Sequence, residues 1–212
     1  MKISEIFFSI QGESSYAGLP CIFIRLAGCN LRCIYCDTVY AQDVEDGYGM
    51  SIDDILHEIK KFKCKIVEIT GGEPLMQDET IPLIKKLLAK GCKVLLETNG
   101  TINLKDIDKR VVKIMDIKTP GSFPSQAFNE GNLKYLKKND EIKFVLVDRN
   151  DYEWAKELIR KYCLEKSANV LFSPAHKRLL PDKLSEWILG DGLHVRLQPQ
   201  LHKIIWGEKK GV

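Results

Sequence analysis

The sequence predicts an α/β fold in which a parallel sheet is built from successive βαβ units. Short apolar, β-branched runs recur between segments whose apolar residues follow helical spacing. The 212 residues are enough to bury a full core. They are fewer than the roughly 250 residues of a closed eight-stranded (β/α) barrel. We therefore expect one domain over residues 1–212, either a doubly wound sheet or an incomplete barrel.

The predicted strands follow one another along the whole chain. We expect them over residues 21–26, 66–69, 94–97, 111–117, 142–147, 169–172 and 194–198. About six of these should be parallel, and residues 3–10 should add an N-terminal strand or hairpin arm.

Amphipathic helices are expected between the strands. Ile52, Ile55, Leu56 and Ile59 follow the i, i+3, i+4, i+7 pattern, and Ser51 with Asp54 can form a capping box. Further helices are expected near residues 78–90, 150–162 and 182–189. The helix near 78–90 should end at a glycine, Gly91, in the left-handed conformation.

Composition narrows the class of protein. Apolar residues make up 44% of the chain and charged residues 29%, which excludes disordered, collagen-like and coiled-coil proteins. The net charge is +3, and the basic residues are spread along the sequence, so we expect no direct nucleic-acid partner. No apolar run is long enough to span a membrane, and the N-terminus does not resemble a signal peptide. We expect a soluble, cytoplasmic protein with no membrane partner.

The cysteines are the most informative residues. There are seven, an odd number, and three of them form the pattern Cys29-x3-Cys33-x2-Cys36. Three thiolates on one loop can bind three irons of a cubane cluster and leave the fourth iron open for a reactant. The natural ligand for that iron is the amino-carboxylate end of S-adenosylmethionine. The other four, Cys21, Cys64, Cys92 and Cys163, are expected to be buried structural residues.

Two other interpretations of the cysteine loop stay open at this point. A structural zinc ion would need a fourth ligand, for which Cys21, His57 and His176 are the candidates. The clustering of three cysteines could also be accidental.

Polar segments follow nearly every predicted strand. They are 70–74, 97–100, 116–118 and 173–174, together with Gln198 and His202 near the C-terminus. Parallel α/β folds place their active sites at the carboxyl ends of the strands, so we expect a single site there.

Two motifs lie one βα unit apart. The cysteine loop, with Tyr35 before its third cysteine, is followed after the next strand by Gly71-Gly72-Glu73-Pro74. Together they resemble the radical S-adenosylmethionine superfamily, in which the aromatic residue lies near the adenine and the Gly-Gly-Glu segment beside the methionine. Glycines permit a close backbone approach, and carbonyl groups or a carboxylate can bind an ammonium group.

Further segments narrow the resemblance to one family. They are Phe8-Ser9-Ile10-Gln11-Gly12-Glu13, Arg25, Asp37-Thr38, Leu96-Glu97-Thr98-Asn99-Gly100, Asp116-Ile117-Lys118 and Gln200-Leu201-His202-Lys203. Over nearly the whole chain the sequence is similar to the 7-carboxy-7-deazaguanine synthase family. The resemblance implies an abbreviated barrel that forms homodimers and takes part in queuosine and deazapurine biosynthesis.

The resemblance also implies a reaction. Members convert 6-carboxy-5,6,7,8-tetrahydropterin into 7-carboxy-7-deazaguanine and release ammonia. Their cofactors are a [4Fe-4S] cluster, S-adenosylmethionine and Mg²⁺, and an external donor of the flavodoxin or ferredoxin type supplies one electron. A 5′-deoxyadenosyl radical then removes the C6 hydrogen of the pterin.

Site residues are implied by the same resemblance. The cluster ligands would be Cys29, Cys33 and Cys36. S-adenosylmethionine would contact Tyr35, Cys36, Asp37, Gly72, Asp116, Ile117, Lys118, Ser173, Pro174, Ala175 and His176, with Asn99 as a lesser candidate. The substrate would contact Ile10, Gln11, Gly12, Arg25, Thr70 and Val212, and Thr38 would bind Mg²⁺. Whether His176 or His202 acts in acid–base chemistry is left open.

The sequence departs from the family in three places. Ser14 follows Glu13 where many relatives have glycine, Asp116-Ile117-Lys118 replaces Ser-Pro-Lys, and Ser173-Pro174 replaces the Gln-Pro of some relatives. Two rival functions are an activase that generates a glycyl radical on a partner protein and a zinc-stabilised binding module.

Overall fold

The computed structural model describes residues 1–122, 128–209 and 211–212, and within them it shows one open sheet of nine strands. The strands are β1 (Lys2–Ile10), β2 (Pro20–Leu26), β3 (Tyr48–Gly49), β4 (Ile66–Gly71), β5 (Lys93–Thr98), β6 (Val112–Asp116), β7 (Glu141–Leu146), β8 (Asn169–Pro174) and β9 (Arg196–Leu197). Their order is β3-β1-β2-β4-β5-β6-β7-β8-β9.

The sheet winds in one direction, as in a barrel. From β2 to β9 each strand is parallel to its neighbour and the order follows the chain, whereas β1 is antiparallel to both β2 and β3. A doubly wound sheet would reverse its strand order near the middle. The incomplete barrel with an N-terminal extension is therefore confirmed, and the doubly wound alternative is wrong. The last strand, expected over 194–198, is shorter than predicted.

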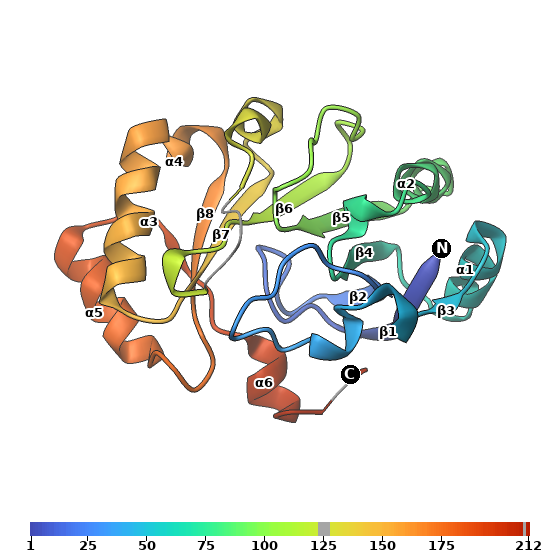
Figure 1. The fold of residues 1–212 in the computed structure, drawn as a ribbon, viewed down its shortest axis with the longest axis horizontal. Coiled ribbons are helices and arrows are strands. Elements are labelled where there is room, and N and C mark those ends of the chain that lie inside the picture. The colour runs from blue at the N-terminus through green and yellow to red at the C-terminus, as the bar shows by residue number, and fades with distance from the viewer. Residues whose placement is uncertain (123–127, 210) are drawn as a thin grey trace.

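Helices cover the outer face of the curved sheet (Figure 1). They are α1 (Ile52–Glu58), α2 (Thr80–Ala89), α3 (Arg149–Tyr162), α4 (Leu164–Ser167) and α5 (Pro181–Asp191). The predicted capping box is present, since Ser51 accepts the Asp54 N–H and the Asp54 carboxylate accepts the Ser51 N–H. The short helices α4 and α6 (Leu201–Trp206) have too few turns to give a helical pattern in the sequence.

The two faces of the strands differ in chemistry because successive side chains alternate. Outward-facing residues such as Ile69, Leu96 and Phe144 are fully buried against the helices and form the main hydrophobic core. Inward-facing neighbours include Glu68, Glu97 and Lys143, which line a cavity. The fold therefore places its apolar layer outside the sheet and its charges inside the curve.

A small second core closes the inner side of the sheet at the amino ends of the strands. Leu95, Val112 and Ile114 are buried there, and Tyr16 from the β1–β2 loop packs against them. Because this end is filled, the cavity opens at the carboxyl ends of the strands.

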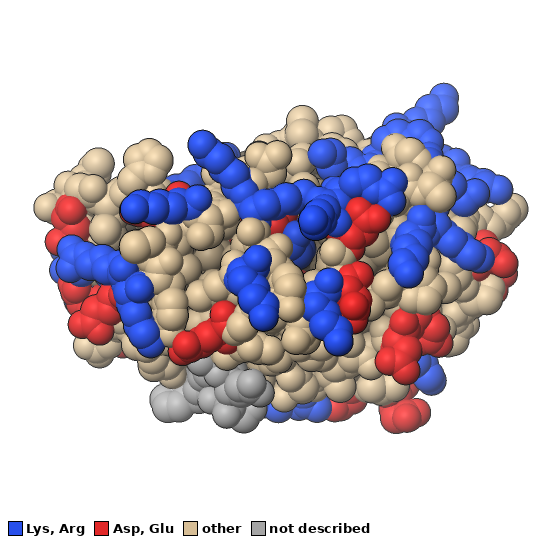
Figure 2. Space-filling model, turned by 90° about the horizontal axis from the view of Figure 1, so that it is seen from above, with Lys and Arg blue, Asp and Glu red and all other residues tan. Residues whose placement is uncertain are grey.

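The surface charge is uneven. Exposed lysines lie just before or at the start of the parallel strands, at the end opposite the cavity, among them Lys65, Lys93, Lys109 and Lys138. Figure 2 shows a face on which Lys and Arg side chains outnumber acidic ones. Basic residues that are scattered in sequence are thus gathered in space. No helix among the described residues is long and apolar enough to cross a membrane.

The ends of β2 and β4 approach each other closely at two glycines. The Gly72 N–H donates to the Leu26 carbonyl (3.0 Å), and the Glu73 N–H donates to the Gly28 carbonyl (2.8 Å). A Cβ on Gly72 would lie 2.0 Å from the Gly28 oxygen, and Gly71 has a φ of +130°. Only glycine fits this contact, which fixes the start of the cysteine loop against the end of β4.

We expect Gly72→Ala to lower the free energy of unfolding by about 1–3 kcal/mol, because the backbone must separate to admit the methyl group. Gly190→Ala is the matched control, since nothing lies within 4 Å of a Cβ there. It sits in α5 and should raise stability by about 0.5–1 kcal/mol. Urea unfolding of both variants measures the difference. Equal stability of Gly72→Ala and the wild type would contradict the close contact.

Candidate active site

A cavity of about 400 Å³ opens at the carboxyl ends of the strands. It is lined by β1, β2, β4, β5, β6 and β7, by the loops that follow them, and by the C-terminal segment. All the site residues predicted from the sequence line it except Ile117, Ser173 and Pro174. Those three are buried, with Ile117 in the hydrophobic core and Ser173 and Pro174 within β8.

The cysteine loop is held by the segment that follows it. The Gly28 N–H donates to the Ala41 carbonyl (2.9 Å) and the Cys29 N–H to the Gln42 carbonyl (2.8 Å), so both ends of the loop are tied together. Cys29, Cys33 and Cys36 are free, partly exposed thiols on the cavity wall.

Electrostatics and donor chemistry suit these thiols to iron. Burial raises the pKa of Cys33, and the Lys118 ammonium lowers it. Cationic neighbours favour the thiolate, which is the form that binds a metal. Among the described residues, no three Cys, His, Asp or Glu side chains are already arranged around one metal position. The donor set of three thiols on one cavity wall nevertheless fits three corners of a cubane cluster.

The other four cysteines differ from the prediction at one position. Cys21 is buried, and Cys64 and Cys92 are partly buried. Cys163 is exposed, and its φ of 49° places it at the left-handed end of α3. The expectation that it is a buried core residue is wrong, because the helix ends there and turns its side chain to the surface.

Glu73 of the Gly-Gly-Glu-Pro motif is directed into the protein. Its carboxylate is fully buried and accepts hydrogen bonds from the N–H groups of Asn99 (2.7 Å) and Leu75 (3.0 Å) and from the Thr98 hydroxyl (2.9 Å). Burial raises the pKa of Glu73 to about 7, although these donors lower it. Of the two groups that could bind an ammonium, the backbone at Gly71 and Gly72 faces the cavity and the carboxylate does not.

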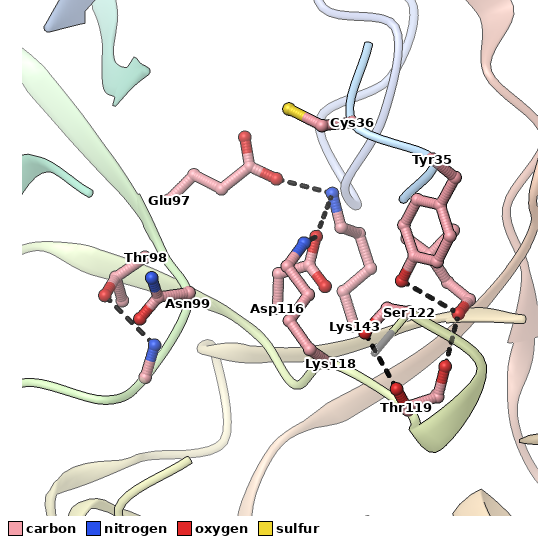
Figure 3. Close-up of polar contacts among 12 residues, drawn as sticks. Tyr35, Cys36, Glu97, Thr98, Asn99, Asp116, Lys118, Thr119, Ser122 and Lys143 are labelled. Carbon is pink, nitrogen blue, oxygen red and sulfur yellow. Dashed lines mark hydrogen bonds and ion pairs between the residues drawn. The ribbon is translucent and has the colours of Figure 1, made fainter. Parts of the chain in front are cut away.

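The wall formed by β6 and β7 carries an ion-pair cluster (Figure 3). Asp116 is bound by Lys118 (2.9 Å) and by Lys143 (3.1 Å). The Tyr35 hydroxyl donates to the Val145 carbonyl (3.4 Å), and burial raises the pKa of Tyr35 to about 12. Tyr35 therefore presents a neutral ring beside these charges.

The opposite wall is formed by β1, β2 and the loop between them. The Arg25 Nε donates to Glu5 (2.7 Å), and its guanidinium lies 5.9 Å from the centroid of the Phe7 ring. Phe7 stacks on Phe23 with the ring centroids 4.8 Å apart. This wall combines a planar cation with an aromatic surface, which suits a flat anionic ligand.

The β1–β2 loop supplies amide and carboxylate groups. Gln11 donates to the buried Glu68 carboxylate and accepts the Glu13 N–H (2.9 Å). Thr70 donates to Glu97 (2.9 Å). The Cys36 sulfur lies 3.6 Å from the Thr38 hydroxyl, which puts Thr38 beside the cysteine loop.

The C-terminal segment packs against the same loop. The Leu201 N–H donates to the Gly12 carbonyl (2.8 Å) and Gln200 donates to Glu13 (2.9 Å). A Cβ on Gly12 would lie 2.2 Å from His202 Nδ1, so glycine is needed here too. Burial lowers the pKa of His202, which favours a neutral imidazole. His176, at the rim, pairs with Glu208 (3.1 Å).

Among the cavity residues without a site role in the sequence-based prediction are three charged residues of the parallel strands, Glu68, Glu97 and Lys143. Each is a charged residue inside an otherwise apolar strand. A charged residue within an apolar strand was the observation that pointed to Arg25 in β2. The same criterion applied to β4, β5 and β7 would have identified these three residues as well.

We expect Glu73→Gln to lower the free energy of unfolding by about 1–3 kcal/mol at pH 8. The amide has one oxygen, so it leaves the N–H of either Asn99 or Leu75 without an acceptor in a buried position. Glu186→Gln is the control, because Glu186 is 63% exposed and pairs only with Lys183 among the described residues. Its effect should stay within about 0.5 kcal/mol. Chemical denaturation of the two variants side by side measures this. Equal losses would show that the buried hydrogen bonds contribute nothing.

Comparison with known proteins places the chain in a family. Residues 23–163 match the family profile of the radical SAM superfamily. The chain is 47% identical to the 7-carboxy-7-deazaguanine synthase of Koribacter versatilis, with all of both chains covered. It is 38% identical to that of Thermoplasma acidophilum, again over all of both chains.

Solved structures agree. The crystal structure of QueE from Escherichia coli matches with a TM-score of 0.76 and 25% identity, covering 95% of this chain and 94% of that one. The crystal structure of Streptococcus suis SuiB bound to the precursor peptide SuiA matches with a TM-score of 0.59 and 18% identity. The match covers 81% of this chain and 46% of that one, and it shows a shared fold. A [4Fe-4S] cluster and S-adenosylmethionine are the cofactors of this superfamily. The chain is an enzyme of the radical SAM superfamily and belongs to the 7-carboxy-7-deazaguanine synthase family.

Proposed function

We propose that this enzyme converts 6-carboxy-5,6,7,8-tetrahydropterin into 7-carboxy-7-deazaguanine with release of ammonia, a step of queuosine and deazapurine biosynthesis. The observation that carries the proposal is that the cysteine loop and the Gln11-Gly12-Glu13 segment line one cavity. Neither rival function, the glycyl-radical activase or the zinc-stabilised module, is favoured by the comparisons.

The cofactor end of the cavity is assigned to the wall that carries the cysteines. Cys29, Cys33 and Cys36 would hold the cluster. When bound, the cluster and S-adenosylmethionine supply a radical that can remove a hydrogen atom from the substrate. Gly72 leaves room for the methionine end, and Asp116, Lys118 and Tyr35 lie where they can bind its polar groups and adenine.

The substrate end is assigned to the wall formed by β1 and β2. Phe7 offers a ring surface and Arg25 a guanidinium for the substrate carboxylate. The hydrogen bond to Glu5 uses Nε of Arg25, so a bidentate contact through the other guanidinium nitrogens would add to it. Gln11, Gly12 and Thr70 would contact the pterin ring.

Magnesium is assigned to the boundary between the two ends. The Thr38 hydroxyl lines the cavity beside Cys36, and Mg²⁺ typically takes few protein oxygens and completes its shell with water and substrate. There it would neutralise the substrate carboxylate. Val212 also lines the cavity and can bring the terminal carboxylate toward the substrate.

The assembly and surroundings belong to the same proposal. We place all 212 residues in one radical SAM domain that forms a homodimer and receives its electron from a flavodoxin- or ferredoxin-type donor. Free thiols at all seven cysteines suit a reducing cytoplasm.

The reconstituted enzyme tests the assignment directly. With dithionite, S-adenosylmethionine, Mg²⁺ and carboxytetrahydropterin under anaerobic conditions, we expect 7-carboxy-7-deazaguanine and ammonia by mass spectrometry, and a lower rate when Mg²⁺ is chelated. Cleavage of S-adenosylmethionine without any deazaguanine would mean that the substrate is a different molecule.

Cysteine variants test the cluster assignment without relying on activity. Serine at position 29, 33 or 36 should abolish the brown colour and the iron and sulfide content, because serine is a poor iron ligand. Cys163→Ser, on the surface at the end of α3, should retain both. Full iron loading of all three loop variants would place the cluster elsewhere.

A further inference from the structure

Lys143 contacts acidic side chains from several parts of the cavity, and none of the roles proposed above involves it. Its side chain on β7 is 6% exposed, and its ammonium contacts Glu13 (2.8 Å), Glu97 (2.5 Å) and Asp116 (3.1 Å). These acids come from three different places: the β1–β2 loop, β5 and β6. Figure 3 shows the amine directed at Glu97 and Asp116.

The charges around Lys143 do not cancel. Glu13, Glu97 and Asp116 bring three carboxylates, and Lys143 with Lys118 brings two ammonium groups, leaving one negative charge. The residual charge favours a ligand that offers N–H donors over one that offers lone pairs.

Glu13, which contacts the ammonium, can be compared with a fourth acid nearby, the buried Glu68. Burial opposes ionisation of Glu13, but Lys143, His202 and hydrogen bonds from Lys143 and Gln200 lower its pKa to about 2. Glu68 binds Gln11 instead of the ammonium. Burial and the Glu97 charge raise the pKa of Glu68 well above its ordinary range, although Lys143 lowers it. Glu13 and Glu68 therefore differ in their contact with Lys143.

We propose that Lys143 is a positioning residue that holds Glu13 and Glu97 side by side, so that they select the 2-amino-4-oxopyrimidine edge of a pterin. This inference rests on the proposed function. The edge presents the exocyclic amino group and the ring N3–H as neighbouring donors, and two carboxylates are matching acceptors. Because Lys143 also binds Asp116, it links this substrate end to the wall assigned to S-adenosylmethionine.

Selection of the edge has a chemical consequence. A lumazine carries a carbonyl oxygen where a pterin carries the amino group, so its lone pairs would face the carboxylates. The wild type should therefore reject it. If the ammonium is removed, Glu13 and Glu97 lose the contact that holds them side by side, and the discrimination should weaken.

The test measures equilibrium binding of fluorescent 6-carboxypterin and of 6-carboxylumazine to the reconstituted holoenzyme with S-adenosylmethionine and Mg²⁺ and without reductant. We expect Lys143→Met to weaken pterin binding about tenfold or more and to reduce the preference for pterin over lumazine by a similar factor. Lys143→Arg, which keeps the charge, should retain most of the preference.

Lys113→Met is the matched control for loss of a buried ammonium. Lys113 lies on the neighbouring strand β6, is 3% exposed and pairs with the buried Asp140 (2.8 Å), away from the cavity. The variant should be less stable but should bind both ligands as the wild type does. If Lys143→Met does not fold, Glu97→Gln decides the question, since it removes one carboxylate acceptor and should also reduce the preference.

Two results overturn the inference. Unchanged preference in folded Lys143→Met or in Glu97→Gln would mean that these groups do not read the pterin edge. A loss of preference in Lys113→Met as large as in Lys143→Met would mean a general structural effect. Failure of the wild type to bind 6-carboxypterin at all would instead count against the proposed function, which keeps the two failures distinct.

Discussion

The ammonium of Lys143 among three carboxylates is the interaction on which the cavity depends. A closed barrel fills its interior with apolar side chains, whereas this open sheet carries Glu68, Glu97 and Lys143 on its inner face. Charges buried in this way are tolerated only when each is paired. The pairing brings Glu13 from the β1–β2 loop to β7, and Gln200 then binds Glu13, so the hairpin loop and the C-terminal segment gather around one side chain.

The cofactor end is held by backbone contacts more than by charge. Glycine at 71 and 72 lets β4 approach the start of the cysteine loop, and Glu73 ties the next turn to the end of β5. A carboxylate in this motif could bind the ammonium group of a ligand, yet here the carboxylate accepts hydrogen bonds from the protein and the glycine backbone faces the cavity. The helices outside the sheet support this arrangement by burying the outer side of the central strands, from β4 to β8.

Many features of the fold and of the cysteine loop could be predicted from the sequence, because each depends on residues close together in the chain. Alternating strand and helix patterns, Ser51 with Asp54, and the spacing of Cys29, Cys33 and Cys36 are all read within one element or loop. What escaped prediction depends on pairing between distant segments. No local pattern indicates that Leu201 binds Gly12, that Glu73 points inward, or that Lys143 finds partners on three other segments. The helix α6 was missed because six residues are too few to give a helical pattern, and the exposure of Cys163 was missed because α3 ends at that residue.

We propose that one cavity brings a substrate pterin to a radical generated at the cysteine loop. Carboxytetrahydropterin labelled with deuterium at C6 tests it most directly, by mass spectrometry of the 5′-deoxyadenosine formed in an anaerobic turnover. We expect one deuterium in the 5′-deoxyadenosine, because the carbon derived from C6 bears the carboxyl group in the aromatic product and keeps no hydrogen. Formation of deazaguanine together with unlabelled 5′-deoxyadenosine would show that the radical does not remove this hydrogen.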